Sequence, residues 1–317
     1  MTPLRWYRHV AHGDGGIRLA GQDVVEVARP ADADVVVLAV CLFQPHRDPA
    51  AWARVVADPV LAARPTRVVA YDCADDEIVP PVPGWTYFRC GAPRRLVDAY
   101  PTLVPFPWPS PDLGWIRRDA PEGPERRYDV TFQGWVRLPV AERALASVRA
   151  AWDGPDAARV HLQGHADFHG YRGHAAGCHR PNDAGSGLSE ETLRREAAYR
   201  EGLRHAWLSL APESIPSVLR YRTTEALSCG RIPVVIGDGH VFPFADRIAW
   251  SRIVVDIAGA RAHEVGPILR EWLRTVSPEE RCAREAEARA AWARWLDKDR
   301  HPEIMATIVR ERLEAAA

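Results

Sequence analysis

Short runs of apolar, often β-branched residues alternate along this chain with longer stretches whose apolar positions recur at helical spacing. In the first third, the runs predict strands over 34–41, 67–71 and 102–105, and a helix over about 48–57. Continuous apolar runs are typical of strands buried on both faces, as in a parallel sheet. The alternation therefore predicts an α/β domain.

Prolines interrupt this pattern beyond residue 104, at Pro105, Pro107, Pro109, Pro111, Pro121 and Pro124. A stretch so rich in proline continues neither a helix nor a central strand, so we expect an interdomain linker here. The expected domains are an N-terminal one over 1–120 and a C-terminal one over 126–300. A last helix, within 301–317, is expected to pack back toward the first domain.

The same alternation restarts beyond the linker. The predicted strands are 128–132, 159–162, 205–211, 232–236 and 252–256, and the predicted helices are 139–152, 189–202, 217–228, 261–275, 278–297 and 302–314. We expect Gly134 in a turn, and a loop rich in Gly and His up to about residue 187. Two Rossmann-like domains with parallel sheets facing one cleft is the simplest architecture.

Composition excludes several classes of protein. A chain of 317 residues, 47% of them hydrophobic and 26% charged, is typical of a globular protein with two domains. The net charge of −1 creates no field that would draw the protein to nucleic acid. No apolar run reaches the roughly 18 residues of a membrane span, and the start of the chain lacks a signal-peptide core. We therefore expect a cytoplasmic protein without a membrane span.

The segment 206–236 is the most informative one. It predicts a strand, a polar loop, a helix that ends at Gly230, and another strand. Open parallel sheets bind ligands at the carboxyl ends of their strands, and a helix N-terminus favours phosphate. Arg222 and Glu225 lie one helical turn apart and suit a ligand with a diphosphate and sugar hydroxyls, so we expect Glu225 to face that ligand. The alternative is an intrahelical ion pair on a solvated face.

A family resemblance rests first on this segment. It is similar to the core motif of exostosin-type glycosyltransferases in the run Arg222-x-x-Glu225-Ala226-Leu227-x-x-Gly230-x-Ile232-Pro233-Val234. The sequence that follows also resembles that family, with a Pro-Phe pair at 243–244 and Trp250 before a strand. Upstream, residues 129–134 and then Arg143 resemble the family's strand, glycine and arginine.

The resemblance covers about 126–275, is specific at 222–255, and carries several implications. It implies the GT-B fold of two Rossmann-like domains. It implies an enzyme that transfers a sugar with inversion, from a UDP-sugar to a hydroxyl of a small-molecule or glycan acceptor. It also implies that neither a metal nor another cofactor is obligatory.

Departures from the family pattern keep alternatives open. The loop 213–217 has less glycine and serine than the family pattern, and Arg220 stands where a small polar residue is usual, which leaves the nucleotide open. The α1,3-fucosyltransferases, which would use a GDP-sugar, have a similar order of sequence features in this segment, although Ala226 replaces an expected lysine. A non-catalytic partner subunit that binds a nucleotide sugar is a further alternative, and a phosphorylase of the same fold is a weaker one. A homodimer is compatible with the sequence.

The resemblance and the expected fold together give the candidate site. The donor-binding candidates are Gly134, Arg137, Arg143, Ser214, Ser217, Arg222, Thr223 and Glu225. We expect Arg222 also to act in catalysis, against the charge on the departing phosphate. An inverting transfer needs a base, expected at the carboxyl ends of strands in the first domain. The candidate bases are His12, Asp14, His46, Asp72, Asp75 and Asp76. Asp72 and Asp75 are preferred, because clustered carboxylates can raise the pKa of one of them, and His12 is kept as a third candidate.

Two sequence features resemble metal sites without matching one. The first is a cluster of His161, His165, His169, His174, Cys178 and His179, whose spacing fits none of the common zinc patterns. The second is Asp32-Ala-Asp34, which precedes a strand instead of following one and is therefore interpreted as a turn. No metal site is expected.

Overall fold

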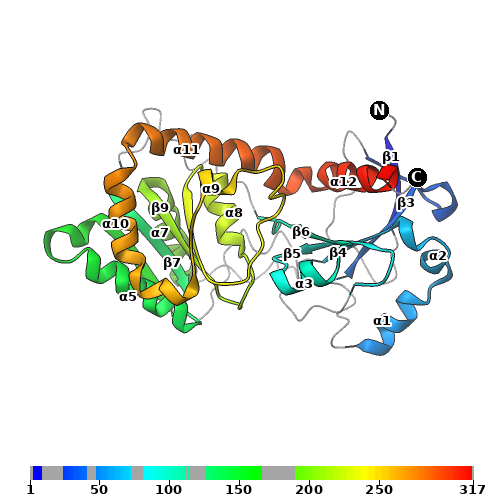
Figure 1. Ribbon diagram of the computed structural model, residues 1–317, viewed down its shortest axis with the longest axis horizontal. Helices are drawn as coiled ribbons and strands as arrows, with labels where there is room; N and C mark the ends of the chain where they lie inside the picture. Colours follow the sequence, from blue (N-terminus) through cyan, green and yellow to red (C-terminus); the bar gives the residue numbers. More distant parts are fainter. Residues whose placement is uncertain are drawn as a thin grey trace. The chain divides into compact units, whose positions relative to one another are not determined.

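The computed structural model describes residues 3–8, 24–40, 48–72, 81–110, 113, 126–165 and 190–315. The chain forms two compact units, one made of Met1–Pro109 with Lys298–Ala317 and the other of Ser110–Asp297. Each unit contains one parallel sheet with helices (Figure 1). The α/β fold class predicted from the sequence is thereby confirmed. No described helix combines the length and the apolar character that crossing a bilayer requires.

The first unit is built on a six-stranded sheet of order β2-β1-β3-β4-β5-β6, in which all neighbours are parallel. The strands are β1 (Leu4–Arg8), β2 (Val24–Glu26), β3 (Val35–Ala39), β4 (Val68–Asp72), β5 (Thr86–Cys90) and β6 (Leu103–Phe106). Its helices are α1 (Pro49–Val56), α2 (Pro59–Ala62), α3 (Arg94–Ala99) and α12 (His301–Ala315). The last helix packs on this unit, where the rings of His301 and Phe106 lie 4.7 Å apart and Arg312 donates to the Thr102 carbonyl.

The second unit is built on a five-stranded parallel sheet of order β11-β10-β9-β7-β8. The strands are β7 (Tyr128–Trp135), β8 (Val160–His165), β9 (Ala206–Pro212), β10 (Ile232–Ile236) and β11 (Val255–Ile257). The helices are α5 (Pro139–Ala151), α7 (Glu190–His205), α8 (Tyr221–Ser228), α9 (Trp250–Ile253), α10 (Val265–Thr275) and α11 (Pro278–Ala291).

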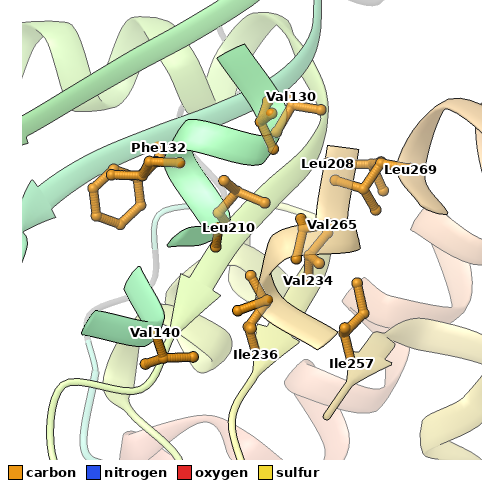
Figure 2. Close-up of a cluster of buried hydrophobic side chains, with 14 of the residues drawn as sticks. Val130, Phe132, Val140, Leu208, Leu210, Val234, Ile236, Ile257, Val265 and Leu269 are labelled. Atoms are coloured by element: carbon orange, nitrogen blue, oxygen red, sulfur yellow. The ribbon is translucent and has the colours of Figure 1, made fainter. Parts of the chain in front are cut away.

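Helices α5 and α10 cover one face of the second sheet. Side chains of β7, β9 and β10 form a core with these helices, in which Val130, Leu208 and Val234 are completely buried (Figure 2). Side chains alternate along a strand, so Thr131 of β7 points to the opposite face, where it meets Gly202 of α7. The sheet is therefore covered on both faces, and its carboxyl edge is where ligand-binding loops emerge.

The structure corrects three predicted elements of this unit. Gly134 does not lie in a turn but inside β7, because the pairing of β7 with β8 continues as far as Trp135 and His165. Helix α8 begins at Tyr221 and not at 217, because Ser217 has a φ of 62°, which no right-handed helix accommodates. Residues from Trp250 form the short helix α9, so the last strand begins at Val255.

Candidate functional site

The loop between β9 and α8 leads into a helix whose first turn has no side-chain cap. Arg220 occupies the N-cap position, and its side chain makes no hydrogen bond to the first turn. The free N–H groups of a first turn carry partial positive charge, which favours an anion. Since α8 starts at the carboxyl edge of a parallel sheet, this helix end is the natural place for a phosphate group.

Arg222, in the first turn of α8, reaches across the sheet edge to β7. Its guanidinium donates to the Gln133 carbonyl and lies 5.4 Å from the centre of the Phe132 ring. Gly134 makes this position possible, because a Cβ atom at residue 134 would overlap the guanidinium. The predicted site residues Gly134 and Arg222, far apart in sequence, are thus brought into direct contact.

The charge of Arg222 is not neutralised within the described part of the chain. No described carboxylate forms an ion pair with it, and its contacts are a backbone carbonyl and the rings of Phe132, Tyr199 and Tyr221. The side chain is half-buried. A guanidinium that is partly removed from water and lacks a carboxylate suits a bound anion, with which it forms strong, charge-assisted hydrogen bonds.

Glu225, one turn further along α8, is buried against α7. The residue is 1% exposed, and its Oε2 accepts a hydrogen bond of 2.8 Å from the hydroxyl of Tyr199 on α7. The alternative of an intrahelical ion pair with Arg222 is absent from the described contacts. Burial raises the pKa of the Glu225 carboxyl well above its ordinary value, which favours the protonated acid.

The raised pKa of Glu225 gives a testable dependence of stability on pH. Between the ordinary pKa and the raised one, the folded protein binds a proton at this site that the unfolded chain does not. This site therefore lowers the free energy of unfolding as pH rises, by up to about 1.4 kcal/mol per pH unit. Glu225→Gln removes the effect, so its stability relative to wild type should increase with pH. Urea unfolding of both proteins at several pH values measures this; a constant difference would contradict the assignment.

The loop 213–217 is held in a strained shape by its neighbours. Ser217 adopts the left-handed φ of 62°, and its N–H donates to the Glu213 carboxylate at 3.1 Å. Glu213 in turn lies over Gly237, where a Cβ atom would come within 2.7 Å of its Oε2. The Ser217 hydroxyl lies over Gly239, at 2.8 Å from where a Cβ atom would be. Because Glu213 accepts from the Ser217 N–H, the hydroxyl is the hydrogen-bond donor of this candidate residue that is left for a ligand.

Two buried polar atoms next to Arg222 have no hydrogen-bond partner among the residues that the structure describes. They are Oγ1 of Thr223, which is completely buried, and Oε1 of Gln133, which is 5% exposed. A buried polar atom without a partner is costly, and such atoms gather where a ligand supplies the missing contact. Thr223 was a candidate from the sequence, whereas Gln133 was not, although it directly precedes the candidate Gly134.

The remaining donor-binding candidates lie around this centre. Ser214 is half-buried in the loop after β9. Arg137 is exposed just beyond β7 and lies 5.2 Å from the ring centre of Trp135, and Arg143 is exposed on α5. No described contact joins Arg137 or Arg143 to Arg222. The structure therefore groups Gly134, Arg222 and Thr223 most closely.

The Pro-Phe and Trp residues of the family resemblance close the loop after β10. The Trp250 indole donates to the Pro243 carbonyl at 2.8 Å, and its ring stacks on Phe242. Phe244 has a φ of 52°, so the chain makes a sharp turn there. This part of the motif thus fixes the loop that carries Gly239 beside Ser217.

Among the candidate bases, only Asp72 lies within the described residues. It ends β4, is 4% exposed, and forms an ion pair of 2.5 Å with Arg89, its neighbour in β5. The Tyr87 hydroxyl also donates to it at 3.2 Å. These contacts favour a role in holding the two strands together. His12 and Asp75 lie outside the described residues and remain predictions, as do Asp14, His46 and Asp76.

The described histidines of the metal candidate are strand residues. His161 stacks on Tyr128 at 5.2 Å, and burial lowers its pKa. His165 ends β8, and its carbonyl accepts from Val136. The other members of that cluster lie outside the described residues. Within the part of the chain that the structure describes, no three His, Cys, Asp or Glu residues are grouped to hold a metal ion. Asp32 ends a short 3-10 turn before β3.

Solved structures of known proteins resemble this chain in fold. A solved glycosyltransferase from Rickettsia africae ESF-5 aligns with a TM-score of 0.50 at 8% identity, over 98% of this chain and 99% of that one. Other similar structures are an α1,3-fucosyltransferase (TM-score 0.44, 11% identity, 98% and 90% covered) and AviGT4, a glycosyltransferase involved in avilamycin A biosynthesis (0.42, 15%, 99% and 99%).

The chain has the α/β fold of the GT-B type, with one parallel sheet in each of its two units. The model of the exostosin GT47 domain matches residues 104–272, more than half of the chain. The chain belongs to the exostosin GT47 family. The fold, the family and the enzyme class predicted from the sequence are thereby confirmed.

Proposed function

We propose that this enzyme transfers a sugar with inversion from a nucleoside-diphosphate donor, a UDP-sugar, to a hydroxyl of a small-molecule or glycan acceptor. The observation that carries the proposal is the environment of Arg222. A half-buried cation without a described carboxylate partner lies in the first turn of an uncapped helix, at the carboxyl edge of a parallel sheet. Fixed positive charge of this kind binds a diphosphate.

The chemistry follows from where charge develops. As the acceptor hydroxyl attacks the anomeric carbon, the bond from that carbon to the diphosphate breaks and negative charge grows on the β-phosphate. The Arg222 guanidinium and the N–H groups of α8 meet this charge, and the Gln133 carbonyl with the Phe132 ring keeps the guanidinium in position beforehand. Hydrogen-bonding groups that are already in position stabilise a transition state most, because they need no reorganisation during the reaction.

The other site residues have narrower roles in the proposal. Thr223 and the Ser217 hydroxyl offer neutral hydrogen bonds near the phosphates. Glu225 is proposed to meet a donor hydroxyl through Oε1, the oxygen that Tyr199 leaves unused, which requires that this oxygen become accessible when the donor binds. A base from the first unit removes the acceptor's proton, with Asp75 and His12 as the proposed candidates.

Nucleotide binding by the full chain tests the proposal. In a thermal-shift screen with UDP, GDP, dTDP and ADP, we expect UDP to stabilise most, since a ligand at 100 times its Kd adds about 2.7 kcal/mol. The shift should persist in EDTA, because the proposed phosphate contacts are Arg222 and backbone N–H groups. A larger shift with GDP would point to a GDP-sugar donor instead. If no nucleotide stabilises the protein, or if EDTA abolishes the shift and Mn²⁺ restores it, the proposed donor site is wrong.

A further inference from the structure

The Tyr199 side chain contacts both Arg222 and Glu225, the charged candidates of α8. Its hydroxyl donates to Glu225 Oε2 at 2.8 Å, and its ring centre lies 5.7 Å from Cζ of Arg222. Tyr199 belongs to α7, so it reaches α8 from a different element. Its ring is fixed in place by a small buried cluster with Leu113, Leu203 and Cys229.

The kind of contact matters for Arg222. A carboxylate beside a guanidinium would cancel its charge, whereas an aromatic face attracts the guanidinium and leaves its net charge intact. Arg222 lies against the rings of Phe132, Tyr199 and Tyr221 and donates to a neutral carbonyl. These contacts hold the cation in position while keeping its full charge for a ligand.

Glu225 is the acidic group of α8 that could cancel that charge. Burial favours its protonated form, but beside the Arg222 guanidinium the ionised carboxylate would be favoured instead. It lies three residues after Arg222 on the same helix, a spacing at which opposite charges pair readily. The described contacts contain no such pair, and Tyr199 is the only described hydrogen-bond partner of the Glu225 carboxyl. A buried carboxyl that lost this partner would have Arg222 as the nearest cation along its helix, and an unpaired buried acid is costly.

We propose that Tyr199 is a positioning residue of the donor site, whose hydroxyl holds Glu225 away from Arg222 and so keeps the Arg222 charge available for the donor diphosphate. This inference rests on the proposed function, because it assigns Arg222 to the diphosphate. Tyr199 itself needs no contact with the donor, and its effect on binding passes through Glu225.

The test is the affinity of the full chain for UDP in wild type, Tyr199→Phe, Glu225→Gln and the double variant. Phenylalanine keeps the ring against Arg222 and removes only the hydroxyl. We expect Tyr199→Phe to raise the Kd for UDP about 10-fold, the scale of a charge-assisted hydrogen bond lost to a competing carboxylate. The double variant should bind UDP more tightly than Tyr199→Phe alone, because a neutral amide cannot cancel the charge of Arg222.

The recovery in the double variant separates this role from structural damage, since a second substitution does not repair a disturbed core. Tyr128→Phe, on β7 and stacked on His161, is the matched control for loss of a hydroxyl. An unchanged Kd in Tyr199→Phe would overturn the inference, as would a double variant no better than Tyr199→Phe. If wild type binds no nucleoside diphosphate at all, the proposed function fails and the inference with it. If Tyr199→Phe does not fold, Tyr199→His and Tyr199→Leu are compared instead, each with Glu225 and with Glu225→Gln. The neutral imidazole N–H of histidine can donate to Glu225 in place of the hydroxyl, whereas leucine cannot. The Tyr199→His protein should therefore bind UDP more tightly than the Tyr199→Leu protein.

Discussion

Arg222→Ala is expected to lower kcat by about 10²–10³-fold. This is the effect of removing one prepositioned hydrogen-bonding group that stabilises an anion forming in the transition state. The thermal stability should change little, because the guanidinium is half-buried and its one described hydrogen bond is to a carbonyl. Arg222→Lys should recover only part of the rate, since an ammonium group cannot form the two parallel hydrogen bonds that a guanidinium offers to phosphate. Steady-state kinetics with a saturating donor, together with melting curves, measures both effects.

The control for this prediction is Arg149→Ala, an exposed arginine in the last turn of α5 that should leave turnover unchanged. Two other arginines of the candidate site provide the contradicting outcome. If Arg222→Ala kept near-normal turnover while Arg137→Ala or Arg143→Ala abolished it, the catalytic cation would belong to the segment after β7. The assignment to α8 would then be wrong.

Gly134→Ala should inactivate the enzyme nearly as far as loss of the arginine itself. The added methyl group would occupy the position of the Arg222 guanidinium. Because the guanidinium is the end of a flexible side chain, it can swing away at low cost to the fold, and the cation leaves its position over the Gln133 carbonyl. We expect kcat to fall by about 10²-fold, which is the loss of most of the arginine's contribution.

The matched control is the same substitution without the arginine. Gly134→Ala added to Arg222→Ala should cost little further activity, because the side chain that it displaces is gone. Kinetics of the four proteins give the coupling between the two positions. Independent, additive losses would mean that Gly134 acts through something other than Arg222.

The elements that the sequence predicts best are those whose burial depends only on their own residues. Residues 232–236 form β10 within the predicted limits, because the apolar run begins two residues after Gly230 and ends directly before Gly237. Strand β5, which was not predicted, shows the opposite case. It is buried throughout although it contains Arg89, and that arginine is neutralised by Asp72 from the neighbouring strand. The hydrophobic pattern of one strand does not reveal that a neighbouring strand supplies a carboxylate for its buried arginine.

The same reason limits the prediction of the site. Arg222, Gly134 and Thr223 were identified by their place in a strand–loop–helix pattern and by the family resemblance. Nothing in that pattern shows that Gly134 makes room for Arg222, or that Tyr199 from a separate helix binds Glu225. These contacts depend on how α7, α8 and β7 meet in space. The burial of Glu225 is a consequence of that meeting, which the pattern of its own helix did not show.

The packing of Ser217 and Glu213 against Gly239 and Gly237 has a consequence for engineering this enzyme. The shape of the loop 213–217 is imposed by a second loop, so the entropy of ordering it is lost during folding and not when a ligand binds. The two loops form one packing unit. Exchanging residues 213–217 alone, with the aim of changing the ligand preference, would place a new backbone against glycines that fit the present one. A successful graft would have to carry residues 237–239 with it.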